Sequence, residues 1–276
     1  MSKARAGLVP DGLRERVAPL LPPAPERRRR YPGRLRVPDR AAPAGILSVL
    51  RTGVAWRDVP AETAGRSGAT AWRRLREGTE AGVRPRPPAA VQTELRRADL
   101  LDLDDRAVAG AHVRALPGGE HTGPLPVDRA RPGSKHQVIA GRHGTPPAVT
   151  LTGGNRRDVT QLLPLRDAVP PPRGLRGRPR RRPRRLYADR GYDFDTYRRL
   201  LRKRGIKPMI ARRGVAHGSG LGQVRWAAER AVAWLHRFKR LRIRYERRAD
   251  LHQGLLALAC SLICLRRLRT SFRNDR

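Results

Sequence analysis

The stretch Arg185-Leu-Tyr-Ala-Asp189-Arg-Gly-Tyr-Asp193 decides how the second half of this chain folds. Residues 186–188 are apolar and include an aromatic ring, as strands do, whereas Asp189-Arg-Gly191 is the kind of sequence that ends a strand in a turn. We therefore expect Asp189 at the carboxyl end of a strand, where open sheets form their ligand crevices. An ordinary turn residue would have the same local sequence, so this stretch by itself leaves both readings open.

The segments around this strand alternate between strand-like and helix-like patterns. Short β-like segments separated by Gly and Pro turns are expected at 107–109, 137–139, 148–151, 186–188 and 207–211. Helical patterns are expected at 158–168, 193–204, 224–240 and 250–268. Three strands, a helix, and then alternating strands and helices predict an α/β fold, namely a mixed sheet with flanking helices of the ribonuclease H-like type.

The first hundred residues predict a set of short helices. One helix begins at Asp11 and is stopped by Pro22-Pro23. A second spans about 44–51 and ends at Gly53, and a third starts near Ser67. We expect residues 1–100 to form a small all-α domain and residues 101–276 to form the ribonuclease H-like domain.

The third of these helices is rich in arginine. It contains Arg73, Arg74 and Arg76, so the three helices resemble a helix-turn-helix unit. In that arrangement the last helix lies in a DNA major groove, with its arginines facing phosphates or guanines. A solvated basic helix face would show the same local sequence, and this alternative stays open.

The chain as a whole is strongly basic. Its 276 residues include 61 Lys plus Arg against 24 Asp plus Glu, which gives a formal net charge of +37. Such a field attracts polyanions and releases their counterions, so we expect double-stranded DNA as a partner. Two loops, 26–30 and 173–185, concentrate the arginines. Nearly all of the basic charge is arginine, a bias that GC-rich coding also produces, so the charge supports DNA binding without proving it.

Cysteine usage and hydropathy indicate a soluble, intracellular protein with no membrane partner. Cys260 and Cys264 lie four residues apart in an apolar run, which suits buried reduced thiols on one helix rather than a disulfide. The longest apolar run, 254–265, is shorter than the roughly 18 residues that a membrane span needs. The N-terminus lacks the apolar core of a secretory signal.

A second stretch, Arg225-Trp-Ala-Ala-Glu229-Arg-Ala-Val-Ala-Trp234-Leu-His236, predicts an amphipathic helix with Glu229 at the margin of its apolar stripe. Cutting and joining DNA strands requires an activated oxygen nucleophile and a neutralised leaving oxygen, and two divalent metal ions supply both. Mg²⁺ (or Mn²⁺) takes oxygen ligands, so Asp189 and Glu229 are candidate metal-binding and catalytic residues. An Arg225–Glu229 ion pair along the helix is the structural alternative.

These motifs give the chain a resemblance to the bacterial insertion-sequence transposases of the DDE type, which have a helical N-terminal segment ahead of a ribonuclease H-like domain. The matching stretches extend over almost the whole chain. Besides the two motifs above, they include Tyr31-Pro-Gly-Arg34, 50–60 (Leu-Arg-Thr-Gly-Val-Ala-Trp-Arg-Asp-Val-Pro), His112-Val-Arg-Ala-Leu116, 126–136 (Pro-Val-Asp-Arg-Ala-Arg-Pro-Gly-Ser-Lys-His) and Leu151-Thr-Gly-Gly-Asn-Arg156.

The resemblance implies roles for individual residues. Asp189 would be the second catalytic carboxylate and Glu229 the third, and Mg²⁺-dependent cutting at the element's ends would precede attack of the freed 3′-hydroxyl on target DNA. The candidate DNA-binding residues are Arg73, Arg74, Arg76, Lys135, Arg190, Arg225 and His236. Two DNA ends must be brought together, so we expect at least a homodimer on DNA, in the bacterial cytosol and associated with the nucleoid.

The first carboxylate of the family's site is missing from this chain. Family members have an Asp three residues before the His of the His112 stretch, and here that position is Ala109. Alanine cannot ligate a metal. Asp105 points to the same strand face, but four residues at about 3.3 Å each place it roughly 13 Å away. Asp102 and Asp104 are no better placed, so we expect no replacement.

Prolines stand where the family has aliphatic residues. Pro43 is expected inside the second helix, and Arg84-Pro-Arg-Pro-Pro88 inside a connecting helix, where an interior proline costs about 3 kcal/mol. Together with Ala109 they suggest a decayed transposase whose strand transfer is weak or absent. The alternatives are a catalytically inactive DNA-binding relic or inhibitor of active relatives, and a basic structural or ribosome-associated protein.

Overall fold

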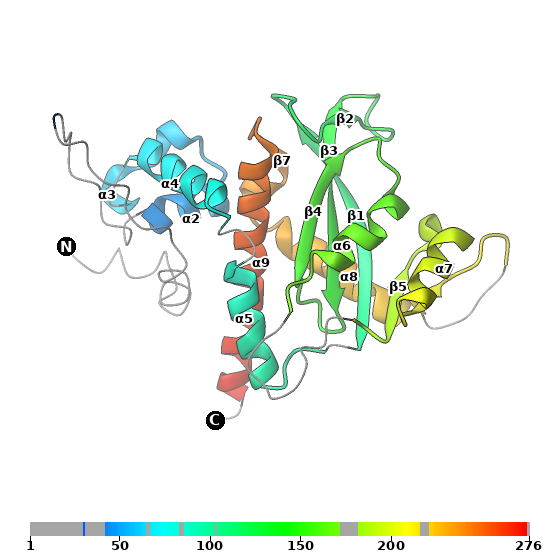
Figure 1. Ribbon diagram of the computed structural model, residues 1–276. Helices are drawn as coiled ribbons and strands as arrows, with labels where there is room; N and C mark the ends of the chain where they lie inside the picture. The colour runs from blue at the N-terminus through cyan, green and yellow to red at the C-terminus, as the bar shows by residue number, and fades with distance from the viewer. Residues whose placement is uncertain are drawn as a thin grey trace.

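The computed structural model describes residue 30 and residues 42–64, 67–82, 86–102, 104–171, 182–215 and 221–274. Short helices occupy the N-terminal side, and a sheet with covering helices follows from residue 105 onward (Figure 1). The helix predicted from Asp11 and most of the two arginine-rich loops lie outside the described residues.

The sheet has the strand order of the ribonuclease H-like fold. Its strands are β1 (Asp105–Ala115), β2 (Gly123–Pro124), β3 (Pro132–Gly141), β4 (Ala148–Gly153), β5 (Arg185–Ala188), β6 (Lys207–Ile210) and β7 (Ile243–Arg244). The long central strand β1 is antiparallel to β3 and parallel to β5. β4 extends the sheet antiparallel to β3, and β6 extends it parallel to β5. The resulting order β4-β3-β1-β5-β6 confirms the predicted fold class, and each predicted strand is present.

Helices cover both faces of this sheet because strand residues alternate between two cores. Ala107 and Val138 face a core shared with α8 (Leu221–Leu235) and α9 (Ala249–Asn274). Val108 and Ile139 face a second core, which contains residues of α6 (Leu162–Asp167) and α7 (Asp195–Lys203). Figure 1 shows α6 in front of the sheet and α8 behind it.

The N-terminal helices follow the sequence closely. α2 (Ala42–Thr52) ends at Gly53, whose φ of +77° is one that glycine adopts without steric cost. α3 (Ala61–Ala64) is short, and α4 (Gly68–Glu80) begins directly after Ser67, as predicted. α5 (Arg86–Arg97) packs along α9, so α9 lies between the N-terminal helices and the sheet (Figure 1).

The prediction that prolines destabilise these helices is wrong for the prolines that the structure describes. Pro43 is the second residue of α2, and Pro87 and Pro88 are the second and third residues of α5. In the first turn of a helix the backbone N–H has no intrahelical partner, so a proline there removes no hydrogen bond. Pro85 lies outside the described residues.

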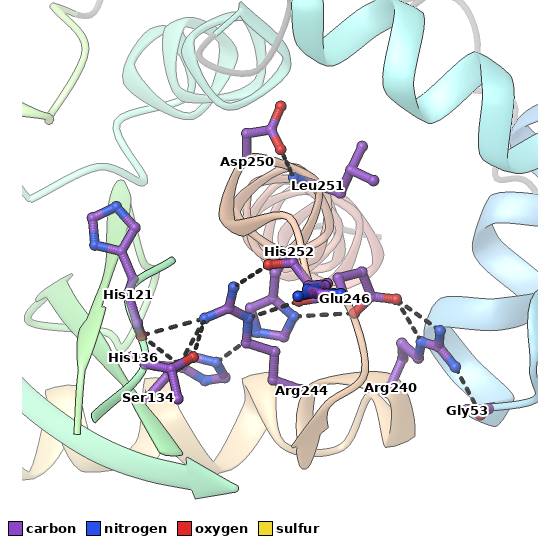
Figure 2. A network of polar contacts seen from close by, with 12 residues as sticks. Gly53, His121, Ser134, His136, Arg240, Arg244, Glu246, Asp250, Leu251 and His252 are labelled. Carbon is purple, nitrogen blue, oxygen red and sulfur yellow. Dashed lines mark hydrogen bonds and ion pairs between the residues drawn. The ribbon is translucent and has the colours of Figure 1, made fainter. Parts of the chain in front are cut away.

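The helix predicted over 224–240 is shorter at its end. α8 stops at Leu235, and the chain turns so that Phe238 is buried as an extended residue ahead of the 3-10 helix η5 (Lys239–Leu241). The prediction continued the helix because Phe238 falls on the same apolar stripe. Phe238 is also buried after the turn, so its apolar side chain is satisfied without a continued helix. The same turn directs the Arg240 side chain into the interior (Figure 2).

The C-terminal helix α9 is a core helix. Its residues 249–270 are long and apolar enough to cross a membrane, but 67% of that apolar window is buried inside the structure. Cys260 and Cys264 are buried and free, as predicted, and burial raises the pKa of the Cys264 thiol to about 12. Both thiols therefore stay protonated and act as small core side chains.

Candidate active site

The pairing of β1 with β5 brings the strand that contains Ala109 next to the strand that leads to Asp189. The two strands run parallel with Asp105 opposite Arg185 and Ala107 opposite Tyr187. The pairing ends at Ala107 and Tyr187, so Ala109 and Asp189 each lie two residues beyond the last pair. Ala109 also packs against the core that α8 covers. The central strand therefore has a methyl group, and no side-chain carboxylate, at residue 109.

Asp189 lies directly after β5, at the carboxyl end of the strand as predicted, and its side chain is exposed. It also caps the short 3-10 helix η4 (Arg190–Tyr192), because its Oδ1 accepts a hydrogen bond of 2.7 Å from the Gly191 backbone N–H. The turn is held further by the Arg190 guanidinium, which donates to the Val215 carbonyl at 2.9 Å. Asp189 thus has a structural task at a position from which one carboxylate oxygen can still reach a ligand.

Glu229 projects from α8, which packs across β1, β3 and β5. Small buried residues, Ala228 and Ala231, anchor the helix on the sheet. Glu229 itself is half exposed and pairs with Arg225 at 3.1 Å, which is the ion pair that the sequence left open as an alternative. At this exposure such a pair contributes little to stability, so it does not prevent Glu229 from binding a ligand.

The DNA-binding candidates on α4 have different surroundings. Arg73 is exposed, whereas Arg74 is largely covered and pairs with Glu77 at 2.9 Å. Arg76 lies over the Trp72 ring at 5.3 Å and within 3.8 Å of Glu80. A phosphate could reach Arg73 directly, but Arg74 would first have to leave its partner.

Lys135 and His236 point into the protein. The Lys135 ammonium donates to the Arg156 carbonyl at 2.8 Å and lies 3.0 Å from Asp158. His236 is partly buried, and its Nε2 lies 3.4 Å from Nδ1 of His136. Their placement as DNA-contacting residues stays a prediction.

Sequence reasoning missed the polar cluster around Asp158. Gln137 donates to Asp158 at 2.6 Å, and a Cβ added to Gly110 would lie 3.0 Å from the same carboxylate oxygen. The sequence indicated Asp158 only as a helix start. Strand alternation predicts that Gly110 and His112 share the face opposite Ala109, but only the β1–β3 register pairs them with Gln137 and Lys135.

Two family descriptions match this chain. "Transposase DDE domain" matches residues 117–264, and "Putative transposase of IS4/5 family" matches residues 9–86. The first covers more than half of the chain. The chain belongs to the DDE transposases of bacterial insertion sequences. By family it is therefore a DNA-cleaving enzyme.

Relatives of this DDE transposase include two proteins of Burkholderia cepacia. The "Putative transposase for insertion sequence element IS402" is 62% identical over 152 residues, which are 55% of this chain and 72% of the relative. An "Insertion element IS402 uncharacterized 16.2 kDa protein" is 45% identical over 119 residues, 43% of this chain and 81% of the relative. Among solved structures, the Mos1 mariner paired end complex with Mn matches 88% of this chain and 82% of that chain at 12% identity, with a TM-score of only 0.26.

The residues present do not fit the three-carboxylate metal site that a DDE transposase implies. Ala109 supplies no oxygen, and in the part of the chain that the structure describes no group of three or more His, Cys, Asp or Glu side chains could hold a metal ion. Asp105 cannot substitute, because it is almost fully buried and its two oxygens accept from Arg185 at 2.6 and 2.8 Å. Asp102 accepts from the backbone N–H groups of residues 104 and 105.

Proposed function

We propose that this DDE transposase binds double-stranded DNA at the ends of its element, and that its metal-dependent cleavage and strand transfer are impaired by Ala109. The observation that supports the proposal is the parallel pairing of β1 with β5, because Ala109 and Asp189 each lie two residues beyond its last pair, Ala107 and Tyr187. A carboxylate on the central strand would complete the set of three oxygen ligands. No acidic residue in the described part of the chain replaces it.

The remaining site residues keep the roles that the family implies. Asp189 and Glu229 are the catalytic carboxylates that would bind Mg²⁺ or Mn²⁺ once the missing ligand at residue 109 is restored. We further propose that residues 1–100 form the DNA-binding domain and residues 101–276 the catalytic domain, that the chain forms a homodimer on DNA, and that it acts in the bacterial cytosol without a membrane partner.

The test restores the missing ligand. Purified chain is incubated with labelled duplex carrying the terminal sequence of its element, in Mg²⁺, Mn²⁺ or EDTA, and strand cleavage is followed on a denaturing gel. The unmodified chain should cut no faster than its Glu229→Gln variant, whereas Ala109→Asp should gain metal-dependent cutting. Ala109→Asn is the matched control, since it adds similar volume without a charged ligand. Robust cutting by the unmodified chain would refute the proposal.

A second candidate is a DNA-binding inhibitor of active relatives, favoured by the same Ala109 and by the net charge of +37. It predicts binding of end DNA that survives EDTA and weakens steeply with salt, because phosphate contacts release counterions. The Ala109→Asp variant distinguishes the two candidates. If the chain is only an inhibitor, this variant still binds DNA but does not cut it.

A further inference from the structure

Arg230, on α8, is held beside two indole rings. Its guanidinium carbon lies 4.3 Å from the centroid of the Trp226 ring and 5.2 Å from that of the Trp234 ring. The three residues are spaced four apart, so their side chains follow one side of the helix. Cation–π attraction fixes the charge near the rings but provides no oxygen acceptor, so the N–H groups of Arg230 still need one.

The β3–β4 hairpin lies directly against this arginine. Gly144 adopts a φ of +81°, and a Cβ added there would lie 2.8 Å from Nε of Arg230 and 3.2 Å from the Trp234 ring. Arg230 also donates to the carbonyl of Arg142 at 3.5 Å. The close approach therefore depends on glycine. It brings Arg142 and His143, whose side chains are exposed, next to Arg230.

Arg267, on α9, adds another charge to this group. Burial first, and then the charge of Arg267, lower the pKa of Arg230 and that of His143. The charges of Arg230 and Arg142 also lower the pKa of His143. Three guanidinium groups and an imidazole from the hairpin, α8 and α9 thus lie within electrostatic range of one another. This basic cluster consists of Arg142, His143, Arg230 and Arg267.

Acidic side chains offset little of the positive charge. Asp102 raises the pKa of His143, but it already accepts hydrogen bonds from two backbone N–H groups. Asp105 lies 3.9 Å from Arg142, but both of its oxygens accept from Arg185. The described residues therefore leave an excess of positive charge beside the hairpin.

Two N–H groups of the basic cluster also lack an acceptor. Nε of Arg230 and Nε of Arg267 are covered from solvent, and no described residue accepts a hydrogen bond from either. A covered donor without an acceptor is unfavourable, and so is the repulsion between neighbouring cations. An anion with several oxygens relieves both, and a phosphate group suits guanidinium groups that approach it from different directions.

We propose that the basic cluster is a binding site for a phosphate group. The anion enters at the exposed side chains of Arg142 and His143, and the partly buried Arg230 and Arg267 are its deeper partners. Glu229 precedes Arg230 in α8, and consecutive residues of a helix point about 100° apart, so this site is separate from the candidate metal site. A free phosphate compound and the DNA backbone both offer the group, and the second source rests on the proposed DNA binding.

The first test uses the full chain and inorganic phosphate. The Nε–H signals of the arginines are followed by ¹H–¹⁵N NMR while phosphate replaces chloride at constant ionic strength. The signals of Arg230 and Arg267 should shift and saturate, because phosphate oxygens accept from these groups. Arg267→Gln should weaken the binding about tenfold, as the loss of a charge-assisted hydrogen bond does. Arg199→Gln, which removes an exposed arginine from α7, should leave it unchanged.

The second test replaces phosphate by a labelled DNA duplex and measures its Kd at several salt concentrations. Each lost phosphate contact lowers the slope of log Kd against log salt by about 0.9. A shallower slope for Arg267→Gln than for Arg199→Gln assigns the site to the DNA backbone. An unchanged slope with weaker binding of inorganic phosphate assigns it to a free phosphate compound. If Arg267→Gln weakens neither ligand more than Arg199→Gln does, the proposal is overturned.

The outcome for DNA binding as a whole is distinguishable from the outcome for this site. If the unmodified chain binds no DNA, the proposed function fails, and the titration with inorganic phosphate still decides whether the basic cluster binds the anion.

A glycine substitution tests the same site without removing a charge. Gly144→Ala should displace Arg230 and weaken phosphate binding. Gly205→Ala is the matched control, because Gly205 has a φ of +70° and nothing lies within 4 Å of its added Cβ. Equal phosphate binding by the two folded variants contradicts the role of Arg230. If a variant does not fold, the signals of Arg230 and Arg267 in the unmodified chain decide, and their failure to shift with either ligand overturns the site.

Discussion

Gly68 is a residue whose identity follows from one close approach. It starts α4, and a Cβ added there would lie 1.6 Å from the Trp56 carbonyl oxygen and 2.7 Å from its carbon. These are backbone atoms, so no side-chain rotation can relieve the overlap. Gly78, in the same helix, has no neighbour within 4 Å of its added Cβ. Substitution of these two glycines therefore distinguishes a steric requirement for glycine from an effect on helix propensity.

We expect Gly68→Ala to lower the free energy of unfolding by about 1–3 kcal/mol, because α4 must move away from the 3-10 helix η2 (Trp56–Asp58). Gly78→Ala should instead raise it by roughly 0.5–1 kcal/mol through better helix propensity. Urea unfolding followed by circular dichroism measures both. Equal effects of the two substitutions would contradict the steric account.

Among the individual elements, α8 has small side chains on its buried face, and it therefore lies close to the sheet. Its buried side contains Ala227, Ala228 and Ala231, whose small side chains let the helix backbone approach β1 and β3. The exposed side contains Glu229 and Ala233. The position of Glu229 relative to β5 therefore depends on how closely this alanine stripe packs.

Ala231→Leu should lift α8 from the sheet and cost about 1–3 kcal/mol of stability, since Ala231 has no exposed surface. Ala233→Leu places the same side chain on the exposed face and should change stability by less than about 0.5 kcal/mol. Thermal unfolding measures the pair. In the repaired Ala109→Asp chain, Ala231→Leu should also reduce cleavage, because Glu229 moves with the helix.

At the scale of the whole molecule, pH acts through buried histidines. The folded-state pKa values of His136, His252 and His236 lie below the ordinary value, so the unfolded chain binds more protons once the pH falls below about 6.5. Their contribution to stability is complete above that pH and is lost as the pH falls. The lowered pKa of Glu246 adds a further loss below about pH 4.5.

The melting temperature should therefore be constant from pH 8 to 7 and fall between pH 6.5 and 5. His136→Gln removes one of the titrating groups, so its decline over the same range should be shallower. Differential scanning calorimetry in buffers of equal ionic strength gives the comparison. A melting temperature that rises on acidification would rule out neutral buried histidines.

Local pattern was enough to predict the elements but not their ends. The strands at 107–109 and 186–188 and the helix after Ser67 were all found from apolar runs and breakers. The two-residue β7 was missed, because so short a strand has no period of its own. The effect of the prolines was predicted wrongly, because the first residue of each helix was not known. A proline lies in the first turn or in the interior depending on where the helix begins.

The sequence by itself determined the α/β class, the positions of Asp189 and Glu229 on a strand end and a helix, and the absence of an acid at residue 109. These are local matters, since strand and helix periods and turn residues act over a few positions. Only the tertiary structure decided that β1 pairs in parallel with β5, and that His136 and His252, 116 residues apart, share a hydrogen bond (Figure 2). Register and burial arise from packing between distant segments, and packing is what makes a polar side chain a buried partner rather than a solvated one.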